Sequence, residues 1–189
     1  MDELIKQILN DSIQAKKEFI SKNLVLINKC AKQIVKALNS GNKILLFGNG
    51  GSAADAQHIA AEFINRFQIE RLPLAALALT TDTSVITSIG NDYSFDDIFT
   101  KQIQGLGKKG DIALGISTSG SSTNVINGVK AAKKMGCKII GFSGEKGELK
   151  ELADFPFCVN SKKTARIQEV HILLAHILCD LTERNYFNG

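Results

Sequence analysis

Residues 43–52 of this 189-residue chain have the sequence Lys-Ile-Leu-Leu-Phe-Gly-Asn-Gly-Gly-Ser, a short apolar run that ends in a glycine-rich turn. Similar apolar runs follow at residues 74–79, 112–116, 138–142 and 155–159, and helical stretches separate them. Short apolar runs that alternate with helices are typical of parallel strands buried on both faces. The sequence therefore predicts an α/β fold, with a doubly wound, five-stranded parallel sheet flanked by helices.

The segments outside this alternating region are also predicted to be helical. Residues 1–40 carry apolar residues at helical spacing in two stretches, which predicts two helices that end at Asn39-Ser40-Gly41 and help to form an oligomer. Residues 164 to about 186 predict a long amphipathic final helix. The chain shows no linker and no internal repeat, so we expect residues 1–189 to form a single domain.

Composition narrows the class of protein. No apolar run is long enough to cross a bilayer, and the acidic start Met1-Asp2-Glu3 lacks the features of a signal peptide. The net charge of +4 comes from scattered lysines without a basic stripe, which argues against a nucleic-acid surface. We therefore expect a cytoplasmic protein with neither a membrane nor a nucleic acid as partner. Its four cysteines form no CxxC pair and are expected to be reduced.

In a doubly wound fold, ligands bind beside the carboxyl ends of the strands, so the turns that follow the strands are the candidate sites. The first turn, at residues 48–52, places glycines and a helix N-terminus where a ligand can approach the backbone. The spacing Gly48-x-Gly50-x-x-Ala53 also fits a dinucleotide fingerprint. That fingerprint expects an acid at the end of the next strand, where this chain has Thr80-Thr81, so we favour a sugar-phosphate site.

A second turn is rich in hydroxyl groups. Residues 117–124 are Ser-Thr-Ser-Gly-Ser-Ser-Thr-Asn, and we call residues 117–123 the hydroxyl loop. Hydroxyl groups together with the N–H groups of a helix start can bind a phosphate without a lysine. A helix cap would need only one hydroxyl, and this loop has six, so the pattern favours a phosphate site over a simple solvated turn.

Two helices carry all three histidines. His58 and Glu62 are four residues apart and share a helix face, which suits either a metal site or an ordinary surface pair. On the final helix, Gln168 and His176 lie about 80° apart in projection, whereas His171 lies about 140° from His176. A His/Glu pair and a Gln/His pair could supply one metal ion with nitrogen and oxygen ligands. Geometry alone does not choose between His176 and His171.

Four motifs stand out along the chain: Phe47-Gly-Asn-Gly-Gly-Ser52, Ile89-Gly-Asn-Asp92, Gly115-Ile-Ser-Thr-Ser-Gly-Ser121 and Arg166-Ile-Gln-Glu-Val-His171. Together they resemble the sugar isomerase (SIS) domain family and, within it, the phosphoheptose isomerases. The resemblance covers nearly the whole chain. The Ser-Thr-Ser-Gly loop alone marks only the SIS superfamily, and the joint presence of the four polar helix residues is more specific. One departure is Ala165, where some relatives carry an acid.

The resemblance implies a homotetramer with active sites at subunit interfaces, one zinc ion per subunit and a small-molecule sugar phosphate as substrate. The zinc ligands that it implies are His58, Glu62, Gln168 and His176. The residues that it implies in substrate contact are Asn49, Gly50, Gly51, Ser52, Glu62, Asn91, Asp92, Ser117, Thr118, Ser119, Ser122 and Gln168.

Family members convert D-sedoheptulose 7-phosphate into D-glycero-D-manno-heptose 7-phosphate, the first step toward the nucleotide-activated heptose of bacterial lipopolysaccharide and surface polysaccharides. Moving the carbonyl from C2 to C1 through an enediol requires a base and an acid, and we assign Glu62 and His176 to these roles. A metal ion could support the enediolate as a Lewis acid. A metal-bound residue is not at the same time a free base, and the sequence leaves this point open.

Two other functions fit the fold. Some SIS proteins are not enzymes, including a factor that associates with the replication initiator and modules that sense sugar phosphates in regulators. A non-catalytic module does not need converging Glu, Gln and His side chains, which favours an enzyme. The remaining alternative is an isomerase of another phosphosugar.

Overall fold

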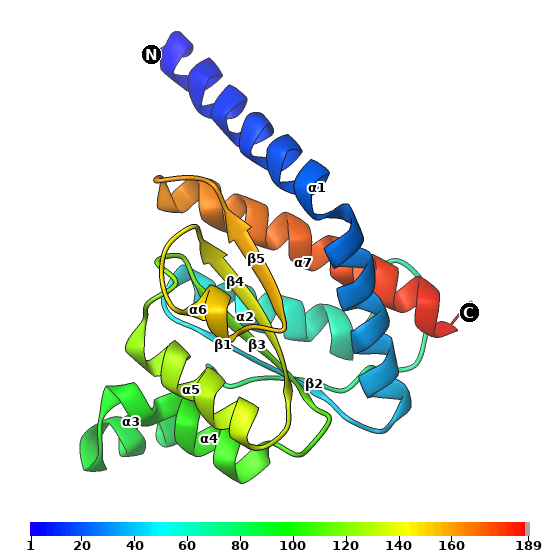
Figure 1. Ribbon diagram of the computed structural model, residues 1–189, viewed down its shortest axis with the longest axis vertical. Helices are drawn as coiled ribbons and strands as arrows, with labels where there is room; N and C mark the ends of the chain where they lie inside the picture. Colours follow the sequence, from blue (N-terminus) through cyan, green and yellow to red (C-terminus); the bar gives the residue numbers. More distant parts are fainter. Residues whose placement is uncertain (188–189) are drawn as a thin grey trace.

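The computed structural model describes residues 1–187 and confirms the predicted architecture (Figure 1). Five parallel strands form one sheet in the order β2-β1-β3-β4-β5. The strands are β1 (Ile44–Gly48), β2 (Ala76–Ala78), β3 (Ile112–Ser117), β4 (Lys138–Gly144) and β5 (Phe155–Val159). The second strand is shorter than the predicted residues 74–79, and it lies at an edge of the sheet.

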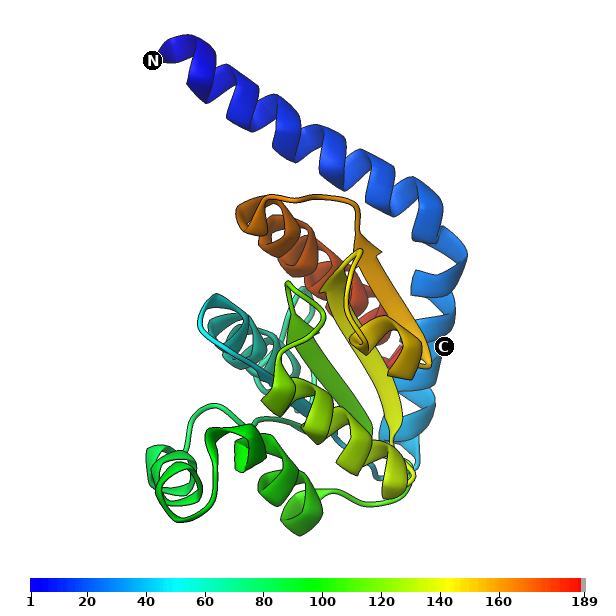
Figure 2. The same cartoon turned by 60° about the vertical axis from the view of Figure 1, so that its left-hand side comes forward.

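Helices cover both faces of the sheet (Figures 1 and 2). They are α1 (Asp2–Asn39), α2 (Gly51–Ile64), α3 (Thr83–Asp92), η1 (Phe95–Asp97), α4 (Ile98–Leu106), α5 (Thr123–Lys134), α6 (Leu149–Leu152) and α7 (Thr164–Phe187). Helices α1, α2 and α7 pack on one face, and α4 and α5 pack on the other. In β1, Ile44 and Leu46 belong to the first core, whereas Leu45 and Phe47 belong to the second. Both faces are therefore buried, which explains why the strands are continuous apolar runs.

The prediction of two N-terminal helices is wrong, because α1 is a single helix of 38 residues. Residues 2–39 contain neither glycine nor proline, so nothing in the segment between the two apolar stretches interrupts the helix. An i,i+4 ion pair of 2.6 Å between Lys22 and Glu18 lies within that segment. The helix ends where predicted, with Gly41 in the left-handed region at a φ of 73°.

The first half of α1 extends beyond the body of the molecule (Figures 1 and 2), and residues 1–10 are all exposed. This half carries apolar side chains, including Leu4, Ile5, Ile8 and Leu9. Within residues 1–187, no helix combines the length and the hydropathy needed to span a membrane.

Candidate active site

The glycine-rich turn joins β1 to α2 at the carboxyl edge of the sheet. Gly50 has a φ of 55°, and a Cβ on Gly48 would lie 2.9 Å from the carbonyl oxygen of Ile116, so both positions require glycine. Asn49 exchanges two side-chain hydrogen bonds with Asn124, of 2.8 and 2.9 Å. Since Asn124 lies at the start of α5, this pair ties the glycine-rich turn to the hydroxyl loop.

The hydroxyl loop forms a compact cluster between β3 and α5. The Oγ atom of Ser117 lies 2.9 Å from Oγ of Ser122 and 3.3 Å from Oγ of Ser119. Ser122 occupies the N-cap position of α5 but forms no side-chain capping bond, so its hydroxyl group does not cap the helix. The cluster therefore directs hydroxyl groups and the start of a 12-residue helix toward the same region, as an anion site requires.

A cavity of about 510 Å³ adjoins the hydroxyl loop. Thr118, Ser119 and Ser121 line one side, and Lys146 and Lys162 line the side formed by the loops after β4 and β5. A space of this size suits a small phosphorylated molecule. Lys146 and Lys162 were not among the residues predicted from the sequence, since only the packing of three loops brings them to the hydroxyl groups.

Three of the four predicted metal ligands come together on α2 and α7. His58 Nε2 lies 3.1 Å from Glu62 Oε1, and the rings of His58 and His176 meet edge to face with centroids 5.1 Å apart. One ligand atom from each of these three residues lies within 4.8 Å of the others. We call His58, Glu62 and His176 the His–Glu–His group.

Gln168 lies elsewhere in the chain. A Cβ on Gly51 would be only 2.4 Å from Nε2 of Gln168, so this amide lies directly against the start of α2. Gln168 and His176 are eight residues apart on α7, and a helix rises about 12 Å over eight residues. The angular projection used for the sequence prediction omits this rise. The structure thus brings Gln168 to the glycine-rich turn and not to His176.

Asn91 and Asp92 form the last two residues of α3, where the Asn91 amide donates to the Asp92 carboxylate at 2.8 Å. Both side chains are exposed. Among residues 1–187, no hydrogen bond joins this pair to the glycine-rich turn, the hydroxyl loop or the His–Glu–His group.

The structure separates the two histidines of α7. His171 is 1% exposed, and its Nε2 lies 3.2 Å from the carbonyl oxygen of Ser143. Burial lowers the pKa of His171 to about 4, although the hydrogen bond to Ser143 opposes the shift. His171 is therefore a neutral core residue, and His176 is the histidine that faces α2.

The loop after α2 (residues 65–72) contributes a residue that the sequence analysis missed. The ring of Phe67 stacks on the ring of His176, with centroids 5.5 Å apart and an interplanar angle of 28°. No periodic pattern marks Phe67, since it lies outside the helices and strands. An aromatic residue five positions after Glu62 was the only available signal.

Comparisons with known proteins agree with these observations. The family profile described as SIS domain matches residues 9–144. The chain is 53% identical over 184 residues to a phosphoheptose isomerase of Thermodesulfovibrio yellowstonii, covering 97% of this chain and 92% of that protein.

Two solved structures are similar to the whole fold. The phosphoheptose isomerase of Francisella tularensis superimposes with a TM-score of 0.92 at 40% identity, covering 96% of this chain and 97% of that one. The enzyme of the same name from Neisseria gonorrhoeae gives a TM-score of 0.89 at 44% identity, covering 96% of this chain and 98% of that one. From its motifs, its fold and these matches, the chain belongs to the SIS domain family.

Proposed function

We propose that this chain is an aldose–ketose isomerase that converts D-sedoheptulose 7-phosphate into D-glycero-D-manno-heptose 7-phosphate. The observation that carries the proposal is the His–Glu–His group. It occurs in a chain that is 53% identical to a phosphoheptose isomerase over 97% of its length. A module that only binds a sugar phosphate would need the hydroxyl loop but not this group.

The reaction needs one group that removes a proton from carbon and one that serves the oxygens. We assign Glu62 and His176 to these roles. The Glu62 side chain is 25% exposed and keeps access to a ligand. The ring of His176 contacts the rings of both Phe67 and His58, and these contacts restrict its orientation. A fixed acid–base pair lowers the barrier because less freedom is lost when the substrate reacts.

The His–Glu–His group also fits a zinc ion. Zinc takes histidine nitrogens and carboxylate oxygens at about 2.0–2.2 Å, which places neighbouring ligand atoms a little over 3 Å apart. The separation of 3.1 Å between His58 and Glu62 already matches, and small rotations would bring in His176. A zinc ion bound there would supply Lewis-acid stabilisation of the enediolate oxygens. Because a metal-bound residue is not at the same time a free base, Glu62 and His176 would leave the metal when the substrate binds and would then act as the acid–base pair.

The other end of the substrate is assigned to the turns at the carboxyl edge of the sheet. The phosphate would bind to Ser117, Thr118, Ser119 and Ser122, and the sugar hydroxyls to Asn49, Gly50, Gly51, Ser52 and Gln168. Asn91 and Asp92 are further proposed substrate contacts, although within residues 1–187 of one chain no hydrogen bond joins them to the other site residues.

We further propose that the active enzyme is a homotetramer with its sites at subunit interfaces. In one protomer, the glycine-rich turn and His58 are separated by seven residues of α2, which is about 10 Å of helix. A second copy of the chain could bring one half of the site to the other. The exposed apolar side chains near the start of α1, such as Leu4, Ile5, Ile8 and Leu9, offer a surface for such an assembly.

The proposed setting is the cytoplasm, where the reaction would begin the synthesis of nucleotide-activated heptose for surface polysaccharides. To test the proposal, the zinc-supplemented protein is incubated with ketose phosphates of five, six and seven carbons. Formation of each aldose product is measured by NMR. Preferred turnover of the seven-carbon substrate supports the proposal. Preferred turnover of a shorter substrate indicates another phosphosugar isomerase, and binding without turnover indicates a non-catalytic SIS protein.

A further inference from the structure

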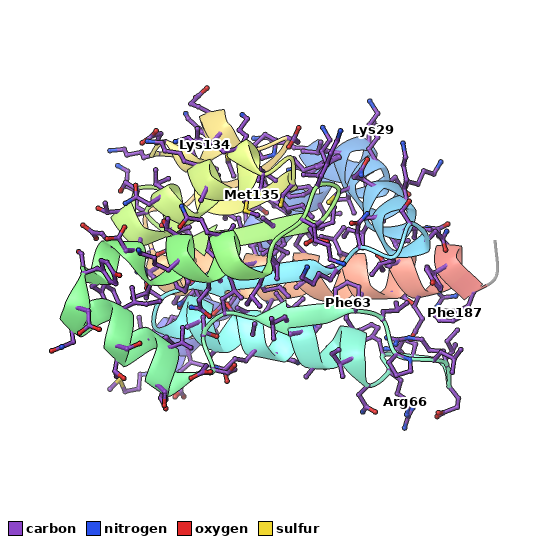
Figure 3. The ribbon with its side chains drawn as sticks, turned by 90° about the horizontal axis from the view of Figure 1, so that it is seen from below. Lys29, Phe63, Arg66, Lys134, Met135 and Phe187 are labelled. Atoms are coloured by element: carbon purple, nitrogen blue, oxygen red, sulfur yellow. The ribbon has the colours of Figure 1, made fainter. Side chains whose placement is uncertain are left out.

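A buried ion pair lies beside the His–Glu–His group at the end of α2. Arg71 Nε donates to Glu183 Oε1 at 2.8 Å, and the two side chains are only 2% and 1% exposed. Figure 3 shows this end of the molecule, with labels on Phe63 near the end of α2, Arg66 in the loop after α2 and Phe187 at the end of α7. A charged pair that is fully removed from water needs further hydrogen bonds to offset its desolvation.

Glu183 obtains those bonds from the loop after α2. Its carboxylate accepts three consecutive backbone N–H groups, from Phe67 at 3.1 Å, Gln68 at 2.8 Å and Ile69 at 3.1 Å. One side chain of α7 therefore fixes the conformation of the loop that carries Phe67. Burial alone would raise the pKa of Glu183, but these donors and Arg71 outweigh it and hold the pKa below its usual range.

Arg71 acts on α2 itself. The last carbonyl groups of a helix have no partner within the helix. Arg71 Nη2 donates to the carbonyl oxygen of Glu62 and Nη1 to that of Phe63, both at 2.8 Å. The guanidinium group therefore caps the end of α2 at the backbone of Glu62, and its positive charge suits a helix C-terminus.

The Arg71–Glu183 pair is also linked to His176, through Phe67. Glu183 follows His176 by seven residues on α7, so both side chains lie on one face, two turns apart. Glu183 holds the backbone N–H of Phe67, and the Phe67 ring stacks on His176. The chain of contacts thus runs from Glu62 through Arg71 and Glu183 to Phe67 and His176.

We propose that Arg71 and Glu183 are positioning residues, which fix the Glu62 backbone and the His176 ring relative to each other. This inference rests on the proposed function, in which Glu62 and His176 are the acid–base pair. Neither Arg71 nor Glu183 needs to contact substrate for this role. A shift of about one ångström in such a pair is enough to reduce turnover strongly.

The test uses Arg71→Lys and Glu183→Gln in the zinc-supplemented full chain. Lysine keeps the charge but loses the planar fork that bonds Glu183, Phe63 and Glu62 together. We expect kcat to fall by about tenfold or more while KM stays nearly unchanged, because the hydroxyl loop that grips the phosphate is remote from the pair. Arg184→Lys is the matched control, since Arg184 is the next residue on α7 and pairs with Asp180 at 2.8 Å on the surface.

A second measurement is independent of turnover. The Phe67 ring shifts the NMR resonances of the His176 ring protons through its ring current, so loss of the stack moves these resonances. We expect them to move in Arg71→Lys and Glu183→Gln but not in Arg184→Lys. Folded variants with wild-type kcat and an unmoved His176 resonance would overturn the inference, as would a change confined to KM. If one variant does not fold, the other decides.

The two proposals can fail separately. Should the wild-type protein turn over no ketose phosphate, the proposed function fails, and the His176 resonance still reports whether Arg71 and Glu183 set the position of the ring.

Discussion

Gly147 packs against Gly120 so closely that a Cβ on Gly147 would lie 2.2 Å from the carbonyl carbon of Gly120. Gly120 belongs to the hydroxyl loop, and Gly147 belongs to the loop between β4 and α6. The backbone N–H of Leu149 donates to the carbonyl oxygen of Gly120 at 3.0 Å, and that of Gly144 donates to Thr118 at 3.1 Å. The loop after β4 therefore supports the proposed phosphate site from behind.

Gly147→Ala should displace the hydroxyl loop, since its methyl group would overlap the Gly120 backbone. We expect KM for the sugar phosphate to rise about tenfold, because a displaced hydroxyl loop would lose several of its contacts with the phosphate at once. The change in kcat should be smaller. Steady-state kinetics would measure both. The control is Gly41→Ala, which has a similar positive φ of 73° but open space around its Cβ. An equal rise in KM for both variants would refute the supporting role.

Glu62→Gln should fold normally and lose turnover by about 10²–10⁴-fold, the range expected for removal of a general acid or base. Its side chain is partly exposed, so an uncharged amide of the same shape should leave the thermal unfolding temperature nearly unchanged. Glu70→Gln, at an exposed acid in the loop after α2, is the control and should keep its activity. Turnover of about a tenth or more of wild type in Glu62→Gln would exclude Glu62 from the acid–base pair.

His176→Gln should lose nearly all turnover, whereas His171→Gln should keep most of it. The reason is position, since His176 faces Glu62 and His171 faces the carbonyl oxygen of Ser143 in the core. His171→Gln is instead expected to lower the free energy of unfolding by about 1–3 kcal/mol, because the buried glutamine amide would not form all of its hydrogen bonds. Kinetics and chemical denaturation would separate the two effects, and the opposite pattern would reverse the assignment.

The stability of the protein should fall in acid because of His171. Its pKa of about 4 in the folded state lies below the ordinary value of 6.5, so the unfolded chain binds the proton more readily. The contribution of His171 to the free energy of unfolding is complete above pH 6.5. As the pH falls toward 4, this contribution decreases by about 3 kcal/mol. Chemical denaturation at several pH values would measure the free energy of unfolding. Between pH 4 and 6.5, this free energy should depend less steeply on pH in His171→Gln than in the wild type. An unchanged slope would contradict the assignment.

Zinc should bind to the full chain and be lost in His58→Ala, since removal of one of three ligands leaves an incomplete site. Titration with a zinc indicator dye would measure the affinity. His171→Gln serves as the control for a histidine outside the group and should bind zinc as the wild type does. Equal affinity in His58→Ala would place the metal elsewhere.

Much of the fold could be predicted from the sequence because strand burial leaves a direct signature. The run Ile44–Phe47 is apolar at every position since alternate side chains enter two different cores. The continuity of α1 could not be deduced in this way, because hydrophobic spacing reports which faces are buried and not whether a polar stretch between them stays helical.

The candidate site was predictable to the extent that its residues lie on regular elements. His58 and Glu62 are one turn apart, so their contact follows from helix geometry alone. The separation of Gln168 from His176 required the rise as well as the angle. The contacts of Phe67 and Arg71 depend on the path of a loop, which no periodicity encodes.

The exposed N-terminal residues of α1 should respond to dilution of the protein. A free helical segment of about three turns is marginal in water, and residues 1–10 have little burial within the protomer to hold them. In the proposed homotetramer a second copy of the chain would cover these residues, so their order would depend on protein concentration through mass action. At low protein concentration the N-terminus should fray and exchange its amide hydrogens rapidly, while the α/β body keeps its protection.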